Sequence, residues 1–344
     1  LIFAVGPLTG TRIAGSGGYC VVTKGALTGG IASSQANGFL GAYLKFCGFD
    51  GIIVQGASER WLYLHVDDEV AELKDAKHLV GKDTYEVEEF IRKALGAKES
   101  GLRVASIGPA RENLVRFAGI FSDTGHAAPH NGTGAVMGSK RLKAIAVARG
   151  TRQIQLKSGE RLPEIALKLL EDVKNLTKKI YDYGTLWANI EAYSDNWLPV
   201  KNYTTSVWQI EKEKLERFSP QYIRSHYENK FHPCWACQVH HCHMMKITDG
   251  PYAGLVTEEP EYEQFASWGP LIDNQDVDAA IMLSNLVDRL GLDTNEAGWT
   301  ISFLMECFEK GILSKEDMDG LEMAWGNVEA TKAMLSKIAK REGF

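Results

Sequence analysis

The sequence predicts an α+β fold, with a sheet-rich domain over residues 1–152 and a mainly helical domain over residues 153–344. Two observations predict this arrangement. Glycine is concentrated in the first 150 residues, which hold 23 of the 34 glycines, and short apolar runs alternate there with turns. Beyond residue 150 the apolar residues recur with a period near 3.6, which is typical of amphipathic helices. The change of period places the domain boundary near residues 150–158.

Six short apolar runs predict strands in the first domain, because each is bounded by turn residues. They are Leu1–Val5, Tyr19–Thr23, Gly51–Val54, Trp61–Val66, Val104–Ile107 and Ala144–Ala148. One helix is predicted over Thr84–Leu95, where apolar residues recur at helical spacing. These residues are Val87, Phe90, Ile91 and Leu95.

The second domain is predicted to consist mostly of helices. Its first apolar stripe at helical spacing consists of Ile165, Leu169, Leu170, Val173, Leu176 and Ile180. Further helices are predicted over Asp276–Leu290, Glu296–Lys310 and Glu329–Arg341. Asn295 and Asn327 stand near the starts of the last two, where a side-chain oxygen can cap free N–H groups.

The charge and apolar content of the chain restrict its partners. A formal charge of −6 and a pI of about 5.9 give no basic surface for a nucleic-acid backbone. The longest apolar runs are far shorter than the roughly 18 residues that a membrane span needs. Small molecules and other proteins therefore remain as expected partners.

The cysteine content and the two ends of the chain predict its setting. Six cysteines in 344 residues are too few for a disulfide scaffold, and no signal peptide opens the chain, so we expect a reducing, cytoplasmic location. Leu1 lies inside an apolar run, and Phe344 follows a helical pattern without a stop signal. Both ends predict an internal piece of a longer protein, with the first domain incomplete at its start and the second at its end.

Three of the six cysteines, Cys234, Cys237 and Cys242, lie within nine residues. Cys-x2-Cys spacing lets two thiolates reach one metal ion or cluster, and a third cysteine can join them. A c-type haem is excluded because Gln238 stands where its motif needs histidine. A structural zinc site, an iron–sulfur cluster with a remote fourth ligand, and free buried thiols remain open. The neighbouring histidines, which can lie beside such a centre or face solvent, are His240, His241 and His243.

Four turns rich in glycine and other small residues lie early in the chain, at residues 6–11, 29–34, 35–41 and 130–140. Such turns let the backbone approach a ligand closely and leave amide groups free for phosphate oxygens. Neither the Walker spacing nor the dinucleotide fingerprint is present. Four such turns together favour a large phosphorylated cofactor over ordinary turn chemistry.

With these segments, the sequence resembles the aldehyde:ferredoxin oxidoreductase family, whose members carry a tungsten bis-pterin centre beside a 4Fe–4S cluster. The resemblance covers the whole chain and rests on short words that occur in order at family-like separations. They are LIFAVGPLTGT (1–11), VVTK (21–24), LTG (27–29), GAYLKFCGFD (41–50), GPA and EN within 107–113, GAVMGSKRLKAIAV (134–147), LPVKNY (198–203), PEYE (260–263), DRLGLDT (288–294) and KIAKREGF (337–344).

The resemblance implies a pterin-binding base domain covered by helical domains. It also implies a tungsten (or molybdenum) bis-molybdopterin and a Mg²⁺ ion that bridges the pterin phosphates. Cys234, Cys237 and Cys242 match three ligands of the 4Fe–4S cluster, whose fourth ligand would lie outside this chain. Cys307 is then predicted to be a core thiol that faces Phe303 and Phe308 on a helix.

The resemblance also assigns residues to the pterins. Asp288 and Asp293, which bracket Gly291 and Leu292, match carboxylates that accept hydrogen bonds from pterin N–H groups. Alternatively, the two aspartates are exposed helix-end residues and Gly291 is a C-cap.

The remaining matches concern the binding of the pterin phosphates and the transfer of a proton in the reaction. Gln35 and Ala127 match positions whose backbone carbonyls bind the Mg²⁺ ion. The other predicted cofactor contacts are Asn37, Gly38 and His130. Glu263 matches a catalytic glutamate near the metal, a role that requires a pKa tuned by burial. Alternatively, it is one more charge in the acidic run over residues 258–261.

Three departures from the family pattern matter. The spacing Cys237-x4-Cys242 is one residue longer than is common. The residues that stand where family members often carry phosphate-neutralising arginines are Gly18, His126 and His130. Positive charge toward the phosphates must therefore come from elsewhere, or the cofactor is held differently. Met282 stands where some members bind a dimer-interface metal, so we do not expect a dimer of that kind.

The predicted function is that of a tungsten (or molybdenum) pterin oxidoreductase. It would oxidise an aldehyde to a carboxylate and pass electrons through the 4Fe–4S cluster to ferredoxin or an iron–sulfur subunit. One alternative is the catalytic subunit of an aryl-CoA reductase of the benzoyl-CoA type, which shares the same skeleton. A second is a zinc-bound, non-catalytic module.

Overall fold

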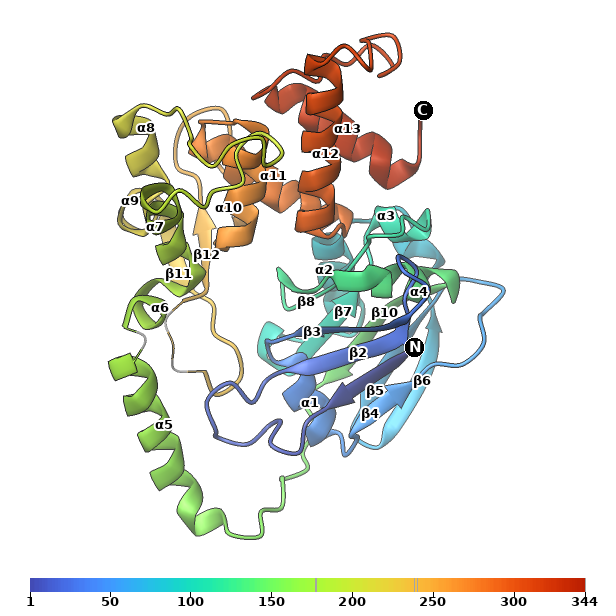
Figure 1. Cartoon of the computed structure of the whole chain (residues 1–344). Coiled ribbons are helices and arrows are strands. Elements are labelled where there is room, and N and C mark those ends of the chain that lie inside the picture. Colours follow the sequence, from blue (N-terminus) through green and yellow to red (C-terminus); the bar gives the residue numbers. More distant parts are fainter. Residues whose placement is uncertain (177, 238, 240, 344) are drawn as a thin grey trace. The chain divides into compact units, whose positions relative to one another are not determined.

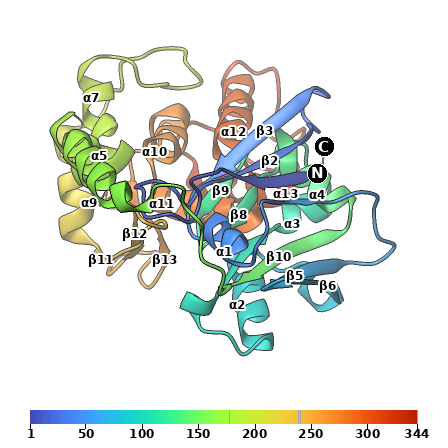
Figure 2. The same ribbon diagram turned by 90° about the horizontal axis from the view of Figure 1, so that it is seen from below.

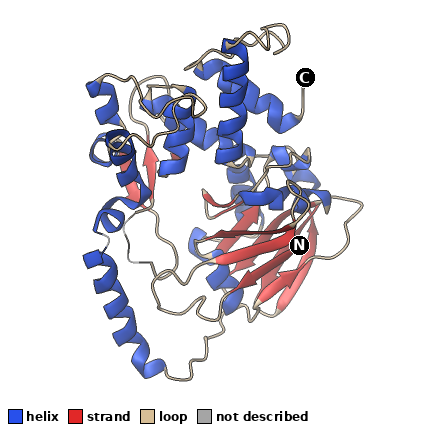
Figure 3. Ribbon diagram, in the orientation of Figure 1, coloured by secondary structure: helices blue, strands red, loops and turns tan. Residues whose placement is uncertain are grey.

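The computed structural model describes residues 1–176, 178–237, 239 and 241–343, and it confirms the α+β class. The chain forms two compact units. Unit 1 comprises Leu1–Leu176, Pro233–Gln238 and Asp288–Asp293, and unit 2 comprises Thr177–His232, Val239–Val287 and Thr294–Phe344. Most strands belong to unit 1 and most helices to unit 2 (Figure 3). The sequence-based domains, 1–152 and 153–344, stay a prediction.

The first sheet of unit 1 has four antiparallel strands in the order β3-β2-β1-β4 (Figure 1). The strands are β1 (Ile2–Val5), β2 (Tyr19–Lys24), β3 (Ile31–Ala36) and β4 (Gly51–Ile53). The reading of residues 29–36 as turns is wrong at β3, which pairs along its whole length with β2. Ala32, Ser34 and Ala36 are buried and alternate with exposed residues, which is the two-residue period of a strand. This period is hard to see in the sequence because the buried side chains are small.

The second sheet of unit 1 has the order β6-β5-β10-β7-β8-β9, in which only β5 and β10 run parallel. Its strands are β5 (Leu62–Asp67), β6 (Val70–Asp75), β7 (Leu102–Ser106), β8 (Ile120–Ser122), β9 (His126–Ala128) and β10 (Leu142–Ala148). The predicted strands β5, β7 and β10 are confirmed, whereas β6, β8 and β9 were not predicted. β8 and β9 have three residues each, which is too short for a visible pattern.

Helices α1 (Leu40–Phe46) and α4 (Thr133–Ser139) each contact both sheets of unit 1. α2 (Thr84–Ala94) packs on the other face of the second sheet (Figure 2). The pleat of β10 explains these layers, because Ile145 and Val147 join the core around α1 while Ala144 and Ala146 join the core around α2. The predicted helix over Thr84–Leu95 is confirmed, and short α3 (Pro109–Glu112) completes this region.

The helix α5 (Leu162–Leu176) ends the first segment of unit 1. An apolar stripe on a helix usually faces a core, but Ile165 and Leu169 of the predicted stripe are each about 40% exposed. The side chain of Leu176 lies outside the described residues. The stripe continues at Ile180 on the following helix, in unit 2, and Ile180 is also exposed.

Unit 2 combines helices with a three-stranded antiparallel sheet in the order β11-β12-β13. Its elements are α6 (Lys178–Tyr183), α7 (Ala188–Ser194), α8 (Lys212–Arg217), α9 (Pro220–His226), β11 (Glu228–Phe231), β12 (His243–Lys246), β13 (Val256–Glu258), α10 (Tyr262–Trp268), most of α11 (Val277–Leu290), α12 (Thr294–Glu309) and α13 (Val328–Lys340). Unit 2 includes α11 as far as Val287. The last three confirm the predicted helices, and Asn327 caps α13 by accepting from Ala330 N at 3.1 Å. The small sheet was not predicted.

Six 3₁₀ turns connect these elements. They are η1 (Lys77–Leu79), η2 (Glu99–Gly101), η3 (His130–Gly132), η4 (Gly159–Arg161), η5 (Gly184–Trp187) and η6 (Pro270–Ile272). Cys307 on α12 is buried, as predicted for a core thiol, although its neighbour Phe303 is exposed. None of the helices formed by the described residues is both long and apolar enough to cross a membrane.

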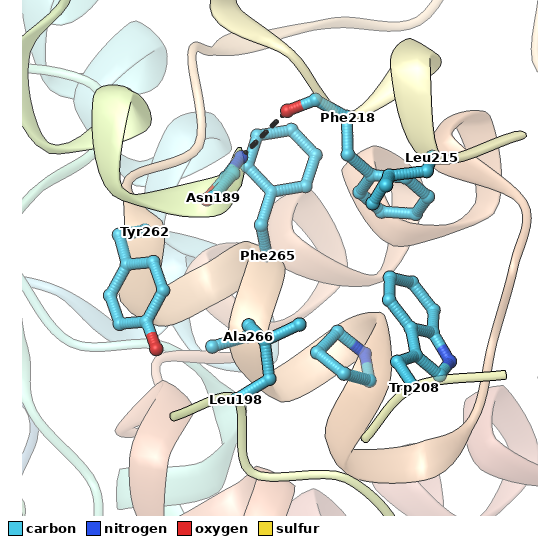
Figure 4. A pocket seen from close by; sticks show the side chains of 9 residues that line it. Asn189, Leu198, Trp208, Leu215, Phe218, Tyr262, Phe265 and Ala266 are labelled. Atoms are coloured by element: carbon cyan, nitrogen blue, oxygen red, sulfur yellow. Dashed lines mark hydrogen bonds between the residues drawn. The ribbon is translucent and has the colours of Figure 1, made fainter. Parts of the chain in front are cut away.

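A small apolar cavity lies inside unit 2, among α7, α8 and α10 (Figure 4). Its volume is about 10 Å³, which is the space that one water molecule needs. Asn189 at its rim donates to Phe218 O at 3.0 Å, and the other side chains around it are mainly aromatic and aliphatic. This cavity is a packing gap and is too small for a substrate.

Candidate cofactor site

A cavity of about 610 Å³ opens in unit 1, within the size range of small-molecule sites. It is lined by residues 4–9, by residues 15, 16 and 18–20, and by residues 35–37. These segments are the end of β1, the turn that follows it, and the facing parts of β2 and β3. The predicted cofactor contacts Gln35 and Asn37 are therefore part of its lining.

The turn after β1 is braced by its own hydroxyl groups. The Thr9 hydroxyl accepts from Gly6 N at 3.0 Å and donates to Gly18 O at 3.3 Å. Ser16 donates to Thr11 O at 2.9 Å. These bonds satisfy the backbone locally, and the turn keeps its shape beside the cavity.

Gly38 is a position that only glycine can occupy. Its φ is +104°, and a Cβ there would lie 2.2 Å from Asp123 Oδ2 and 2.7 Å from His126 Cδ2. The same Asp123 oxygen accepts from Phe39 N at 2.6 Å, at the start of α1. The Gly38 carbonyl accepts from Trp235 N at 2.9 Å, so this turn also anchors the Cys-x2-Cys segment.

The two predicted carbonyl ligands lie on the edge strands of different sheets. Gln35 is on β3 and Ala127 is on β9, and these strands contact each other. Edge strands carry backbone carbonyls outside the ladder, which can bind a cation. His130 N donates to Ser34 Oγ at 3.1 Å and ties the turn after β9 to β3.

The segment Asp288–Asp293 is held inside unit 1. Gly291 has a φ of +79° and follows the end of α11, and a Cβ there would lie 2.9 Å from Gly108 N. Leu292 is buried and bridges to Ala118. The C-cap interpretation of Gly291 therefore agrees with the structure.

Both aspartates of this segment are buried, at 4% exposure for Asp288 and 2% for Asp293. The alternative that they are exposed helix-end residues is wrong. Thr84 Oγ1 donates to Asp288 O at 2.9 Å, and His130 Nδ1 lies 3.0 Å from Asp293 Oδ2. Through His130 the structure thus links Asp293 to Ser34, next to the cavity-lining Gln35.

Of the three predicted cluster ligands, Cys234 and Cys242 are buried and Cys237 is partly buried. Cys234 and Cys237 belong to unit 1 and Cys242 to unit 2. Cys234 Sγ lies 3.3 Å from His126 Nε2, and Cys237 N donates to Cys234 O at 3.2 Å. Ala236, between them, has a φ of +54°, a conformation that residues other than glycine adopt rarely.

Cys242 in unit 2 stands beside two other potential ligands. Ligand atoms of His241, Cys242 and Glu261 lie within 4.8 Å of one another. His241 Nδ1 is buried, and Glu261 accepts from Thr185 Oγ1. Burial raises the pKa of Glu261, and the Thr185 hydroxyl opposes the rise. His240 lies outside the described residues.

A partly buried arginine supports the backbone next to Cys242. Arg224 Nε and Nη2 donate to the two carboxylate oxygens of Glu259 at 3.1 and 2.8 Å, and Nη2 also donates to His241 O at 2.9 Å. Burial raises the pKa of Glu259 to about 7 against the effect of Arg224. Sequence reasoning missed this pair, because residues 224 and 259 share no motif.

Glu263, the predicted catalytic residue, lies in the first turn of α10 and is exposed. The described residues do not bury it, so they do not supply the environment that a proton-transferring glutamate needs. Its catalytic role stays a prediction.

Comparison with known proteins decides the family. The family model "Aldehyde ferredoxin oxidoreductase, N-terminal domain" matches residues 1–149, and the model "Aldehyde ferredoxin oxidoreductase, domains 2 & 3" matches residues 163–344. The chain belongs to the aldehyde ferredoxin oxidoreductase family. The resemblance seen in the sequence is thereby confirmed.

Relatives within this oxidoreductase family extend the match. A tungsten-containing aldehyde ferredoxin oxidoreductase of Pyrococcus furiosus is 39% identical over 350 residues, which cover 100% of this chain and 56% of the relative. The WOR-like subunit of an aliphatic sulfonate oxidoreductase of the same organism is 31% identical over 357 residues, again 100% and 56%. The chain thus spans about half the length of the curated relatives it matches.

A solved structure shares the fold. It is the active site complex BamBC of benzoyl coenzyme A reductase in complex with 1,5-dienoyl-CoA, with a TM-score of 0.85 and 28% sequence identity. The match covers 100% of this chain and 52% of that chain. The α+β architecture of aldehyde ferredoxin oxidoreductases is therefore present along the whole of this sequence.

Proposed function

We propose that the complete protein is a tungsten- or molybdenum-pterin oxidoreductase that oxidises an aldehyde to a carboxylate. Electrons would pass through a 4Fe–4S cluster to ferredoxin or to an iron–sulfur subunit in a reducing cytoplasm. The observation that carries the proposal is the link from the 610 Å³ cavity through His130 to the buried Asp293. This link connects the glycine-rich turn at residues 130–140, which is expected to face phosphate, to Asp293, a carboxylate of the pterin motif. Both belong to unit 1.

The described residues fit such a cofactor. The cavity is large enough for part of it, and the turn that contains Gly38 has no room for a side chain. Asp288 and Asp293 offer buried acceptors to pterin N–H groups, and the edge strands of Gln35 and Ala127 offer carbonyl oxygens to Mg²⁺. Cysteine side chains at positions 234, 237 and 242 suit iron ligation, because thiolates are the usual ligands of iron–sulfur clusters.

Each residue then has a task that its position supports. A bound metal–pterin centre supplies two-electron redox chemistry. Asp288 and Asp293 orient the pterin, and His130 holds the Asp293 carboxylate at 3.0 Å. The Asn37–Gly38 turn holds the Cys-x2-Cys segment through Trp235. Glu263 donates or accepts the proton of the reaction once a neighbour outside the described residues buries it.

Metal and pterin analysis of the complete gene product, purified without oxygen, tests the proposal. We expect iron, sulfide, tungsten or molybdenum, and an extractable pterin. Cys234→Ser should abolish the visible absorption of the iron–sulfur cluster, whereas Cys307→Ser, which changes a buried thiol on α12, should leave it unchanged. A colourless wild-type protein without pterin contradicts the proposal.

Two alternatives have observations of their own. The fold shared with the benzoyl coenzyme A reductase complex supports an aryl-CoA reductase, which would reduce an aromatic thioester in place of oxidising an aldehyde. The group His241, Cys242 and Glu261 supports a zinc-bound module, because its donors suit zinc. Zinc as the only metal would favour the module, and turnover of an aromatic thioester alone would favour the reductase.

A further inference from the structure

The imidazole of His126 lies against the first cysteine of the Cys-x2-Cys segment. His126 is the first residue of β9, and both it and Cys234 are 8% exposed. His126 Nε2 lies 3.3 Å from Cys234 Sγ, a distance that suits a hydrogen bond to sulfur. Both residues belong to unit 1, although 108 positions separate them in the sequence. The fold of this unit therefore brings a buried ring nitrogen to a predicted cluster ligand.

The backbone around His126 holds its ring in this place. β8 and β9 pair so that Ser122 stands opposite His126, and Ser122 Oγ donates to His126 O at 3.4 Å. Gly38 provides the room for the ring, because a Cβ on Gly38 would lie 2.7 Å from His126 Cδ2. A strand pairing and a glycine turn thus fix the imidazole.

The cysteine is held by the residue that follows it. Trp235 N donates to Gly38 O at 2.9 Å, and Trp235 Nε1 donates to Thr11 O at 2.8 Å. The indole also packs edge-on against the Phe46 ring, with 4.9 Å between the ring centroids. Two hydrogen bonds and a ring contact within unit 1 therefore set where Cys234 Sγ lies.

The chemistry of an iron ligand decides which partner donates in this contact. A cysteine that binds iron is a thiolate, which accepts hydrogen bonds and has no proton to donate. The hydrogen must therefore reside on His126 Nε2. Hydrogen bonds to the sulfurs are among the factors that set the reduction potential of an iron–sulfur cluster. They stabilise the reduced cluster more than the oxidised one, because reduction adds a negative charge.

We infer that His126 donates a hydrogen bond to the Cys234 thiolate and thereby raises the reduction potential of the 4Fe–4S cluster. This inference rests on the proposed function. It gives position 126 a task that the sequence left open, because family members often carry a phosphate-neutralising arginine there. Among the described residues, those that line the 610 Å³ cavity do not include His126, and its ring nitrogen contacts a sulfur instead.

The experiment compares variants of the complete protein, purified without oxygen and analysed for iron and sulfide. A redox titration followed by electron paramagnetic resonance measures the reduction potential of the cluster. His126→Met, which removes the donor, should lower the equilibrium constant for reduction about tenfold, which lowers the potential by about 59 mV for one electron. His126→Gln should stay close to wild type, because the glutamine Nε2 is as many bonds from the backbone as the histidine Nε2 and carries N–H groups.

His78→Met, at an exposed histidine of η1 in the same unit, is the control and should leave the potential unchanged. A wild-type potential in His126→Met would overturn the inference. An equal shift in His126→Gln would also overturn it, because a change of packing would then explain both variants.

The iron and sulfide content separates the remaining outcomes. Loss of the cluster from both variants, as in Cys234→Ser, would overturn the inference and make His126 a ligand or a purely structural residue. Loss from His126→Met, with a wild-type potential in His126→Gln, would support the donor, because only glutamine keeps an N–H group. A wild-type protein without iron and sulfide would instead refute the proposed function.

Discussion

Each of the two units holds an arginine within its fold, and the two units differ in how they compensate its charge. In unit 2, Arg224 donates to both carboxylate oxygens of Glu259 and to the carbonyl oxygens of His241 and Asp182. In unit 1, Arg111 is more deeply buried and has one carbonyl acceptor, Gly291 O, among the described residues. The first arginine is satisfied by the fold itself.

The two arginines differ in how their charge is compensated. The ion pair of Arg224, with four hydrogen bonds, stabilises one arrangement of the surrounding backbone, here the segment next to Cys242. The terminal nitrogens of Arg111 have no hydrogen-bond acceptor among the described residues, and a buried cation without an anion lowers the stability of a fold. Variants at charged and polar groups inside the two units test this difference.

Arg224→Met should lower the free energy of unfolding by about 3–5 kcal/mol, because it leaves the buried Glu259 carboxyl without its arginine and the carbonyl oxygens of Asp182 and His241 without their donor. Urea denaturation at neutral pH measures the loss. Arg217→Gln, an exposed arginine of α8, is the control and should change the free energy by less than about 0.5 kcal/mol.

The double variant Arg224→Met, Glu259→Gln should recover part of this loss, since the uncompensated charge is gone. If Arg224→Met proved as mild as Arg217→Gln, the contrast between the two arginines would disappear.

Lys143→Met tests the same rule inside unit 1. Lys143 on β10 is fully buried, pairs with Glu112 and donates to Lys82 O at 3.0 Å. We expect a loss of about 3 kcal/mol in the free energy of unfolding, measured in urea. A gain in stability would contradict the view that paired and unpaired buried cations differ within one unit.

Much of this could be predicted from the sequence, but only where the signal is local. The strand period of apolar runs predicted β1, β5 and β10, and the order of motifs predicted the family. β3 escaped because Ala and Ser, which carry little apolar contrast, fill its buried positions. The contact of Arg111 with Gly291 O could not be predicted, because it depends on a fold that brings two residues 180 positions apart together.

The buried acid Glu88 of α2 gives a pH-dependent test. Burial raises its pKa from the ordinary 4.5 to about 6, although Arg92 and the Thr124 hydroxyl partly compensate its charge. The native state therefore holds this proton more tightly than the unfolded chain, and its contribution to stability falls as pH rises from 4.5 through 6. The fall amounts to about 2 kcal/mol.

Glu88→Gln should remove this dependence. The difference in unfolding free energy between wild type and variant, followed in urea from pH 4 to pH 7.5, should shift by about 2 kcal/mol in favour of the variant. A difference that stays constant over this range would show that the native carboxyl is no harder to ionise than the unfolded one.

Tyr19→Phe should have the smallest effect. The Tyr19 hydroxyl donates to Ser122 Oγ at 3.1 Å, and its loss should cost about 1 kcal/mol of unfolding free energy. Burial raises the pKa of Tyr19, so the hydroxyl is neutral at ordinary pH and the variant removes a hydrogen bond and no charge. Urea denaturation measures the loss, and a loss above about 3 kcal/mol would mean that Tyr19 does more than bond Ser122.

Anomalous diffraction at the tungsten or molybdenum edge, from crystals of the complete protein grown without oxygen, tests the central claim most directly. We expect a heavy-metal peak beside the cavity of unit 1, with pterin density against the carboxylates of Asp288 and Asp293. A crystal without such a peak, or with metal only at His241, Cys242 and Glu261, would contradict the assignment of unit 1 as the pterin site.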